Sequence, residues 1–349
     1  EFAAALGFSL ALGSAVITLY SVLNGVIQPV LGYVADRWHT RLISVGGLLM
    51  TAVGSSMLGL APHYVILLAL AMLGGMGTAV YHPQAAAMVV ALAGRRRATV
   101  MSLYLMGGNV GLALGPLAAS AVIVARGLHA TWVALIPGIA GAVMLAYFAP
   151  RDWSQTARGT GPGLVAIIRR HWATLWRLFA VVITRSWAHY TLLALLPFYL
   201  RDLGVGTAEK GFIVTLITLA GAIGGVIGGY LADRWLSRRT VIVGSLAISS
   251  VFVLLLLHSE GWARYPWATL TGMTLLGSFA VLTVKGQELM PQNIGLASGF
   301  MLGLTISLGG LFVLPMGWIA DNLLDVRTVI HAAVALPLVA AALARTLPE

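Results

Sequence analysis

The sequence predicts an all-α membrane protein built from two pseudo-symmetric helical bundles, and three observations carry this prediction. Of its 349 residues, 59% are hydrophobic and 9% are charged, and the mean hydropathy is +0.92, which exceeds what a soluble domain needs. Apolar runs long enough to cross a bilayer recur along the chain, separated by short polar or Gly/Pro stretches. A seven-residue pattern also occurs twice, once in each half of the chain.

Eleven apolar segments are predicted to be transmembrane helices. They cover residues 10–33, 42–60, 65–92, 99–125, 131–149, 175–200, 211–231, 240–257, 267–290, 296–320 and 326–347. The longest interruption, residues 150–174, carries four arginines. We interpret it as a linker between an N-terminal bundle at residues 1–149 and a C-terminal bundle at residues 175–349.

The positions of the arginines predict the orientation in the membrane. If the loop after Tyr33 is cytoplasmic, then the run Arg95, Arg96 and Arg97, the linker and the C-terminus lie on the same side, as the positive-inside rule requires. The net charge of +10 is then explained by topology, without a nucleic-acid partner. Glu1 would lie outside the cell, so we expect one further helix before it, giving two bundles of six.

The repeated pattern marks the cytoplasmic end of one helix in each half. The run GYVADRW at residues 32–38 recurs as GYLADRW at residues 229–235, with six of seven positions identical. The glycine permits close helix approach, and the aspartate can meet either a neighbouring helix N-terminus or a basic group. A positive-inside turn would explain one copy, but two copies indicate a duplicated element. A weaker echo, GWIAD, occupies residues 317–321.

Both copies resemble the G-x-x-x-D-R-x-x-x-[RK] motif of the major facilitator superfamily, found between the second and third helices and echoed between the eighth and ninth. With one helix placed before Glu1, both copies fall in those loops. The resemblance implies the major facilitator fold and a cytoplasmic gate that helps to hold one conformational state. It assigns gating roles to Asp36, Arg37, Arg41, Asp233, Arg234 and Arg238.

A narrower resemblance covers nearly the whole chain. The runs YHPQ at residues 81–84, GGNVGLALGP at 107–116, QELMP at 287–291 and IGLASG at 294–299 are similar to the fosmidomycin resistance protein branch of that superfamily. This branch comprises bacterial inner-membrane exporters of small antibiotics. The resemblance implies export driven by the proton gradient, with no cofactor. Two positions depart from it, because Gln84 replaces an expected acidic residue and Lys285 an expected uncharged one.

Glycines form one face of the helix predicted at residues 99–125. Gly107, Gly111 and Gly115 are spaced four residues apart and are followed by Pro116. Such a face lets two helices touch backbone to backbone, and the proline can bend the helix end. A similar run is associated with antiporters in the superfamily that the chain resembles, and plain helix packing is the alternative interpretation.

Ionisable side chains inside predicted helices are the candidate substrate-binding residues, because charge in the bilayer is costly. Arg185 lies near the middle of its helix, His82 and Asn109 lie at similar depth, and His189 with Tyr190 follows Arg185 by about one turn. We expect these side chains to line one polar cavity that binds a small anion such as a phosphonate, carboxylate or hydroxamate. The alternatives are a structural ion pair or carbonyl-capping role for Arg185 and a structural role for His82.

Proton coupling is assigned to three residues, and two more are candidates for substrate contact. His82 can exchange a proton near neutral pH, and Glu288 stands three residues from Lys285, close enough to pair. An interfacial ion pair is the alternative for Glu288 and Lys285. Asn24 and Gln28 lie one turn apart and are predicted to pack through hydrogen bonds or to face the substrate.

Other classes of function fit the sequence less well. An ATP-driven pump needs a phosphate-binding loop ending in Lys-Ser/Thr, and an intramembrane hydrolase needs a nucleophile with a base or a His-Glu-x-x-His metal site. Neither pattern occurs, so we expect no enzyme activity, metal or cofactor. The sequence predicts a monomeric secondary transporter that works by alternating access, exporting a small anionic antibiotic or metabolite in exchange for protons across the bacterial inner membrane. Proton-coupled uptake or facilitated transport of an organic anion is the alternative, and a passive channel or receptor is the alternative from another class.

Overall fold

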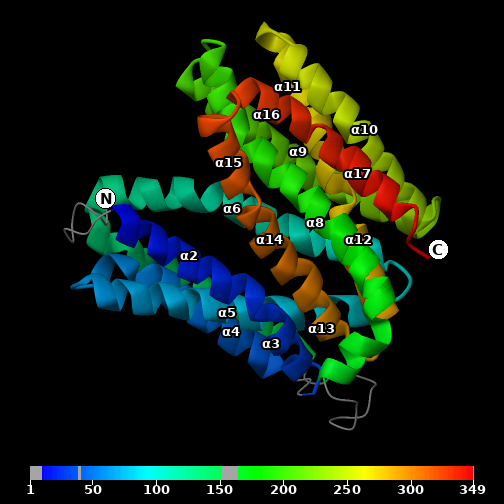
Figure 1. The fold of residues 1–349 in the computed structure, drawn as a ribbon. Helices are drawn as coiled ribbons and strands as arrows, with labels where there is room; N and C mark the ends of the chain where they lie inside the picture. The colour runs from blue at the N-terminus through cyan, green and yellow to red at the C-terminus, as the bar shows by residue number, and fades with distance from the viewer. Residues whose placement is uncertain (1–9, 38–40, 151–163, 349) are drawn as a thin grey trace. The chain divides into compact units, whose positions relative to one another are not determined.

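The computed structural model describes residues 10–37, 41–150 and 164–348, and these ranges contain helices and turns but no strand (Figure 1). Each of the eleven predicted segments coincides with one helix or with consecutive helices. Among the residues that the structure describes, nine helices are long and apolar enough to cross a membrane, and Val22–Ala35 is a shorter apolar helix. The predicted all-α membrane fold is therefore confirmed.

Unit 1 of the structure comprises the described parts of Glu1–Leu92, Leu114–Leu164 and Met290–Ser307. It contains the second half of α6 (Arg97–Arg126) together with complete helices. These are α2 (Leu10–Val26), α3 (Gln28–Ala35), α4 (Arg41–Ser56), η1 (Met57–Leu60), α5 (Tyr64–Leu92), η2 (Leu128–Ala134), α7 (Leu135–Phe148), α13 (Ile294–Ser298) and the π-helix η4 (Gly299–Leu304).

Unit 2 comprises Ala93–Ala113, Val165–Leu289 and the described part of Leu308–Glu349. It contains the first half of α6 and most of α14 (Thr305–Leu311). Its other helices are α8 (Leu164–Asp202), α9 (Thr207–Arg234), α10 (Arg238–His258), η3 (Gly261–Ala263), α11 (Arg264–Gly277), α12 (Phe279–Leu289), α15 (Val313–Asn322), α16 (Val326–Ala333) and α17 (Ala335–Ala344).

The two units do not follow chain order throughout. Residues 93–113 belong to unit 2 and residues 290–307 to unit 1, so each unit includes one segment from the other half of the chain. The predicted division into bundles at residues 1–149 and 175–349 stays a prediction. Residues 151–163 of the predicted linker lie outside the described residues.

Local chemistry explains several helix boundaries. Pro29 stands in the first turn of α3, where its missing N–H costs no hydrogen bond. Ser237 caps α10 by accepting a hydrogen bond from the Thr240 N–H at 3.1 Å, and Asp325 caps α16 by accepting from the Thr328 N–H at 2.6 Å. Each cap satisfies a backbone donor that the first helical turn leaves without a partner.

Glycines bring α9 and α11 into backbone contact within unit 2. A Cβ atom at Gly224 would collide with the backbone of Met273, one at Gly228 with the carbonyl oxygen of Gly277, and one at Gly272 with Ile217. Membrane helices associate through packing of this kind, since lipid provides no hydrophobic driving force between them. The absence of side chains at these positions therefore holds α9 against α11.

Replacing Gly224 with alanine should destabilise the protein, because the added methyl group has no space against Met273. We expect a loss of about 1–3 kcal/mol in the free energy of unfolding, as for overpacked cores. Gly244 in α10 is the matched control, since no atom lies within 4 Å of its added Cβ. Gly244→Ala should be neutral or stabilising by up to about 1 kcal/mol. Unfolding of the purified protein in SDS measures both changes, and equal destabilisation would contradict the packing argument.

Candidate functional site

The first copy of the repeated motif binds the N-terminus of α13 within unit 1. The carboxylate of Asp36, just beyond α3, accepts hydrogen bonds from the backbone N–H groups of Gly295 at 2.6 Å and Leu296 at 2.8 Å. A Cβ at Gly32, one turn earlier, would collide with the carbonyl oxygen of Gly295. The glycine therefore lets α3 approach α13 closely enough for Asp36 to reach free N–H groups at the positive end of the helix.

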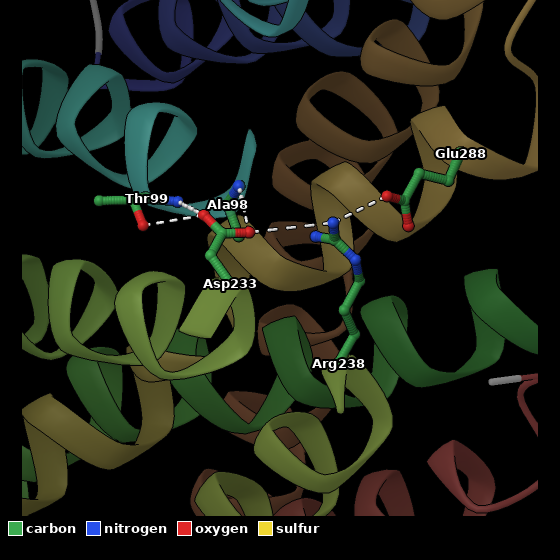
Figure 2. Close-up of polar contacts among 5 residues, drawn as sticks. All are labelled: Ala98, Thr99, Asp233, Arg238 and Glu288. Carbon is green, nitrogen blue, oxygen red and sulfur yellow. Dashed lines mark hydrogen bonds and ion pairs between the residues drawn. The ribbon is translucent and has the colours of Figure 1, made fainter. Parts of the chain in front are cut away.

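The second copy repeats this arrangement in unit 2, as Figure 2 shows. Asp233 accepts hydrogen bonds from the N–H groups of Ala98 at 3.2 Å and Thr99 at 2.7 Å, and from the Thr99 hydroxyl at 2.8 Å. These residues form the first turn of α6. A Cβ at Gly229 would overlap with the Ala98 carbonyl oxygen. The sequence predicts that each aspartate contacts either a helix N-terminus or a basic group. In both copies the aspartate binds a helix N-terminus.

A basic group adds to the second copy. Nη2 of Arg238, in the first turn of α10, lies 3.9 Å from Asp233 and 2.8 Å from the Oε1 atom of Glu288 in α12 (Figure 2). The sequence predicts a pair of Glu288 with Lys285 on the same helix. Lys285 is 5% exposed. Arg238 thus connects the motif of α9 to the end of α12, and the sequence does not predict this connection.

We expect Arg238 and Glu288 to be coupled in stability. Their side chains are 19% and 31% exposed, so solvent screens the pair only in part, and a double-mutant cycle of Arg238→Gln and Glu288→Gln should give about 0.5–1 kcal/mol. The exposed pair of Arg201 and Asp202, with side chains 60% and 53% exposed, is the control and should show no measurable coupling. Unfolding in SDS reports each variant, and additivity at both pairs would contradict the expectation.

The arginines of the two motifs also pack alike. The guanidinium carbon of Arg37 lies 4.3 Å from the ring centroid of Tyr33, and that of Arg234 lies 5.9 Å from Tyr230. Arg37 also donates a hydrogen bond to the Tyr33 hydroxyl, and Arg41 donates to the carbonyl oxygen of Ala149 at 2.8 Å. These contacts are cation–π and carbonyl interactions at helix ends.

Burial affects the charge of Asp36, which lies outside the apolar helix that precedes it. Burial raises the pKa of this carboxyl group from its ordinary value of 3.8 to about 7, although the N–H groups of Leu296 and Gly295 act to lower it. The charge that favours the contact with α13 is therefore gained and lost near neutral pH.

The third echo of the motif lacks these contacts. Asp321 is exposed at the end of α15, and no atom lies within 4 Å of a Cβ built at Gly317. Within the described ranges, only the two full copies bring a motif glycine against the start of another helix.

Arg185 is buried in α8, where it is 2% exposed. Its Nε atom donates a hydrogen bond to the carbonyl oxygen of Leu275 at 3.2 Å, and its guanidinium carbon lies 4.7 Å from the ring centroid of Phe279. Its Nη2 atom is buried and has no hydrogen-bond partner among the described residues. Asn109 and Phe279 line one small cavity, so unit 2 places Arg185 and Asn109 beside the same aromatic ring.

The residues that follow Arg185 are also largely buried. His189 is 8% exposed, and its Nδ1 atom has no hydrogen-bond partner in the described part of the chain. Its ring centroid lies 5.2 Å from that of Tyr190. Tyr190 packs against Gly309, where an added Cβ would lie 2.6 Å from the tyrosine ring. The α8 face that carries His189 is therefore poor in polar partners, which is unfavourable unless a ligand or water supplies them.

The remaining predicted binding residues belong to unit 1. The Nε2 atom of Gln28 donates a hydrogen bond to Asn24 Oδ1 at 3.0 Å, and Gln28 is fully buried against Gly303 of η4. His82 packs its ring 5.5 Å from that of Tyr81, immediately before Pro83 inside α5. The predicted cavity shared by His82 and Arg185 stays a prediction.

The predicted helix packing of the glycine face on α6 stays a prediction. No heavy atom lies within 4 Å of a Cβ built at Gly107, Gly111 or Gly115. The first turns of α6 are buried, at Ala98, Met101 and Ser102. The side chain of Pro116 lies outside the described residues.

Three partners of the site were missed in the sequence. Thr99 and Gly295 supply backbone N–H groups, and Phe279 supplies the ring beneath Arg185. The positions of Thr99 and Gly295 could have indicated this role, because both lie at the start of a predicted apolar segment, where backbone N–H groups of a helix have no partner. Phe279 has no comparable signal.

Comparison with known proteins places this geometry in a family. The family model of the Major Facilitator Superfamily matches residues 1–314. The chain is 30% identical over 315 residues to the uncharacterized MFS-type transporter YfnC of Bacillus subtilis, covering 86% of this chain and 76% of the relative. It is 28% identical over 310 residues to the fosmidomycin resistance protein of Escherichia coli, covering 87% and 76%.

The comparison with solved structures agrees in fold. A crystal structure of the Escherichia coli fucose:proton symporter FucP matches with a TM-score of 0.78 at 15% identity, covering 97% of this chain and 91% of the symporter chain. At this identity the match shows the fold alone. Taken together with the family match, it shows that the chain belongs to the Major Facilitator Superfamily and is a multi-pass membrane transporter, not an enzyme.

Proposed function

We propose that this transporter exports a small organic anion from the bacterial cytoplasm in exchange for protons, by alternating access. Arg185 is the observation that carries the proposal. It keeps its charge at all physiological pH values, it is 2% exposed within a membrane-spanning helix, and its Nη2 atom has no hydrogen-bond partner among the described residues. A charge in this position is costly unless a partner is bound.

An anionic substrate would provide that partner. A phosphonate, carboxylate or hydroxamate has acceptor oxygens that the fork of a guanidinium group can bind in pairs. Asn109, beside the same Phe279 ring, can donate and accept further hydrogen bonds. The apolar ring beside the guanidinium group leaves the N–H edge of that group as the binding direction, and N–H donors favour an anion over a cation.

Separate observations support export and proton coupling. The relative from Escherichia coli is named for resistance to fosmidomycin, and resistance is a property that export can produce. Residues with exchangeable protons are present at His82 and Glu288, and Arg238 pairs with Glu288. The arginine distribution supports a cytoplasmic linker and C-terminus in an inner-membrane protein.

Transport by the full-length protein in liposomes tests the proposal. With the lumen at pH 6 and the outside at pH 8, protons that leave should drive labelled phosphonates, carboxylates or hydroxamates into the lumen. The accumulation should saturate with concentration and collapse with a protonophore. Accumulation only under the opposite gradient would instead mean uptake with protons, and leakage that does not saturate would mean a channel.

A further inference from the structure

A second polar cavity lies at the far end of unit 2 from the Asp233 contacts. Helix α10 begins with Arg238 beside Asp233 and ends at His258, on the edge of a cavity of about 600 Å³. Residues of α8, α10, η3, α11 and α16 line it. Its polar lining residues are Tyr199, His258, Ser259, Glu260, Arg264, Arg327 and His331.

Two histidines face each other in this lining. The ring centroids of His258 and His331 lie 5.2 Å apart with an angle of 84° between the rings. The Nδ1 atom of each ring lies within hydrogen-bond distance of a backbone carbonyl one turn earlier, at 2.9 Å from Leu254 and 2.7 Å from Arg327. A carbonyl oxygen only accepts, so Nδ1 carries the proton in both neutral rings. Each Nε2 atom is then the position that gains a proton and becomes a donor.

Tyr199 does not compete for this role. Its ring lies 5.8 Å from that of His331, but its hydroxyl donates a hydrogen bond to the Leu257 carbonyl oxygen at 2.7 Å. The tyrosine therefore forms an apolar wall behind His331, and the histidine rings and arginines supply the donors.

Arginines outnumber carboxylates in the cavity lining. Nη1 of Arg264 lies 3.5 Å from Glu209, and its Nε donates to the Ser259 carbonyl oxygen at 3.2 Å. Arg327 interacts with Asp325, and Glu260 is the acidic residue of the lining. While both histidines are neutral, the lining carries two guanidinium groups and one carboxylate, and each guanidinium group has a carboxylate partner outside the lining. Protonation of both histidines adds two positive charges.

We propose that this cavity is an acid-dependent anion site that binds a phosphate, phosphonate or carboxylate group when His258 and His331 are protonated. Arg264 and Arg327 supply permanent donors, and the two Nε2 groups supply the donors that appear in acid. At higher pH the histidines lose these charges and their Nε2 donors, so the anion is bound more weakly. The inference requires neither transport nor a ligand at Arg185.

The anion can come from water or from lipid. Trp262, directly after Gly261 of the cavity lining, is 79% exposed, and tryptophan is enriched where helices meet the membrane surface. A dissolved phosphate and a phospholipid headgroup present the same oxygen atoms to the site. The chemistry of recognition is shared, and the experiment separates the two sources.

Binding of radiolabelled inorganic phosphate to the full-length protein tests the inference. The protein is placed in phosphatidylcholine nanodiscs and carries Arg185→Gln, which removes the other candidate anion site. We expect saturable binding at pH 5.5 that weakens at least tenfold by pH 8. Nanodiscs containing phosphatidylglycerol form the second arm, where loss of phosphate binding identifies the lipid headgroup as the occupant and unchanged binding identifies a dissolved anion.

Replacements in the lining decide whether the histidines and arginines bind. His331→Gln and Arg327→Gln should each weaken binding at pH 5.5 at least fivefold. Arg327 is exposed and contacts His331 through its backbone carbonyl, so its replacement leaves the fold intact. Arg201→Gln is the control, because Arg201 is an exposed arginine near the same end of α8 that does not line the cavity.

The inference is overturned if phosphate binding is absent at millimolar concentration in both nanodiscs, if it does not change with pH, or if both lining variants bind as the control does. If the protein with Arg185→Gln does not fold, His331→Gln and Arg327→Gln are tested singly in the protein that keeps Arg185. The part of phosphate binding that is present at pH 5.5 and lost at pH 8 is then compared between these variants and the control.

Discussion

Arg185→Gln should lower substrate affinity by about 100-fold while the protein still inserts and folds. Glutamine retains a donor for the Leu275 carbonyl oxygen, but it removes the charge and the paired donors that an anion would use. Loss of such charge-assisted hydrogen bonds in a buried site costs roughly 3 kcal/mol, which corresponds to about two orders of magnitude in affinity. Equilibrium binding of labelled substrate to purified protein measures the change.

Two further variants separate direct contact from general damage. Arg185→Lys keeps the charge but not the planar fork, so it should bind about tenfold more weakly than the original protein. Tyr199→Phe, in the same helix, removes the hydrogen bond to the Leu257 carbonyl oxygen and should lower stability without changing affinity. The loss at Arg185 should be greatest for the most negatively charged substrates. Normal binding by Arg185→Gln, or failure to fold, would make Arg185 a structural residue.

Asp36→Asn should slow transport about tenfold and leave substrate affinity within about threefold. Asparagine has nearly the same shape, but its amide nitrogen cannot accept the second N–H bond from Gly295 and Leu296. An unsatisfied N–H group costs about 1–2 kcal/mol. The conformational state in which Asp36 contacts α13 is therefore destabilised relative to the other states. Rates of substrate exchange in liposomes, compared with equilibrium binding, separate the two quantities.

The repeated motif and its third echo provide the controls for this prediction. Asp233→Asn should act in the same direction, because its carboxylate binds the N-terminus of α6 in the same way. Asp321→Asn changes an exposed aspartate at the end of the third echo and should leave the exchange rate unchanged. A complete loss of substrate binding by a folded Asp36→Asn protein would show that Asp36 contacts the ligand.

The effect of Asp36→Asn should depend on pH in a defined direction. Since burial raises the pKa of Asp36 to about 7, the original carboxyl group is largely protonated below about pH 6 and resembles asparagine in charge. The difference between the two proteins should therefore be small at pH 6 and greatest at pH 8. Asp36 binds its proton more tightly in the folded protein than in the unfolded chain, where its pKa is 3.8. Its contribution to the free energy of unfolding therefore falls as pH rises through 7.

The sequence predicted the helices and the duplicated element because both depend on local patterns. Hydrophobic run lengths located all eleven segments, and the repeat located Asp36 and Asp233 at helix ends. The chemistry of an aspartate after a close-packing glycine also predicted a helix N-terminus as one partner. Which helix each aspartate binds could not be predicted, because α13 and α6 are distant in sequence and their approach depends on how the whole chain folds.

The rest of the candidate site escaped prediction for a related reason. Glu288 binds Arg238 from α10, and no spacing within α12 reveals a partner on another helix. His258 and His331 lie 73 positions apart in the chain, and only the fold brings their rings together.

The contact between Asp36 and α13 also sets an order of events during synthesis. The hydrogen bond from Gly295 to Asp36 spans 259 positions of the chain. At roughly 5–20 residues per second, a ribosome needs about 13–50 s to reach Gly295 after it has made Asp36. The first helices therefore enter the membrane and pack before their aspartate has its partner, and until then this carboxyl group must be solvated by water or lipid headgroups. The nascent protein completes this contact only after nearly all of its helices have been made.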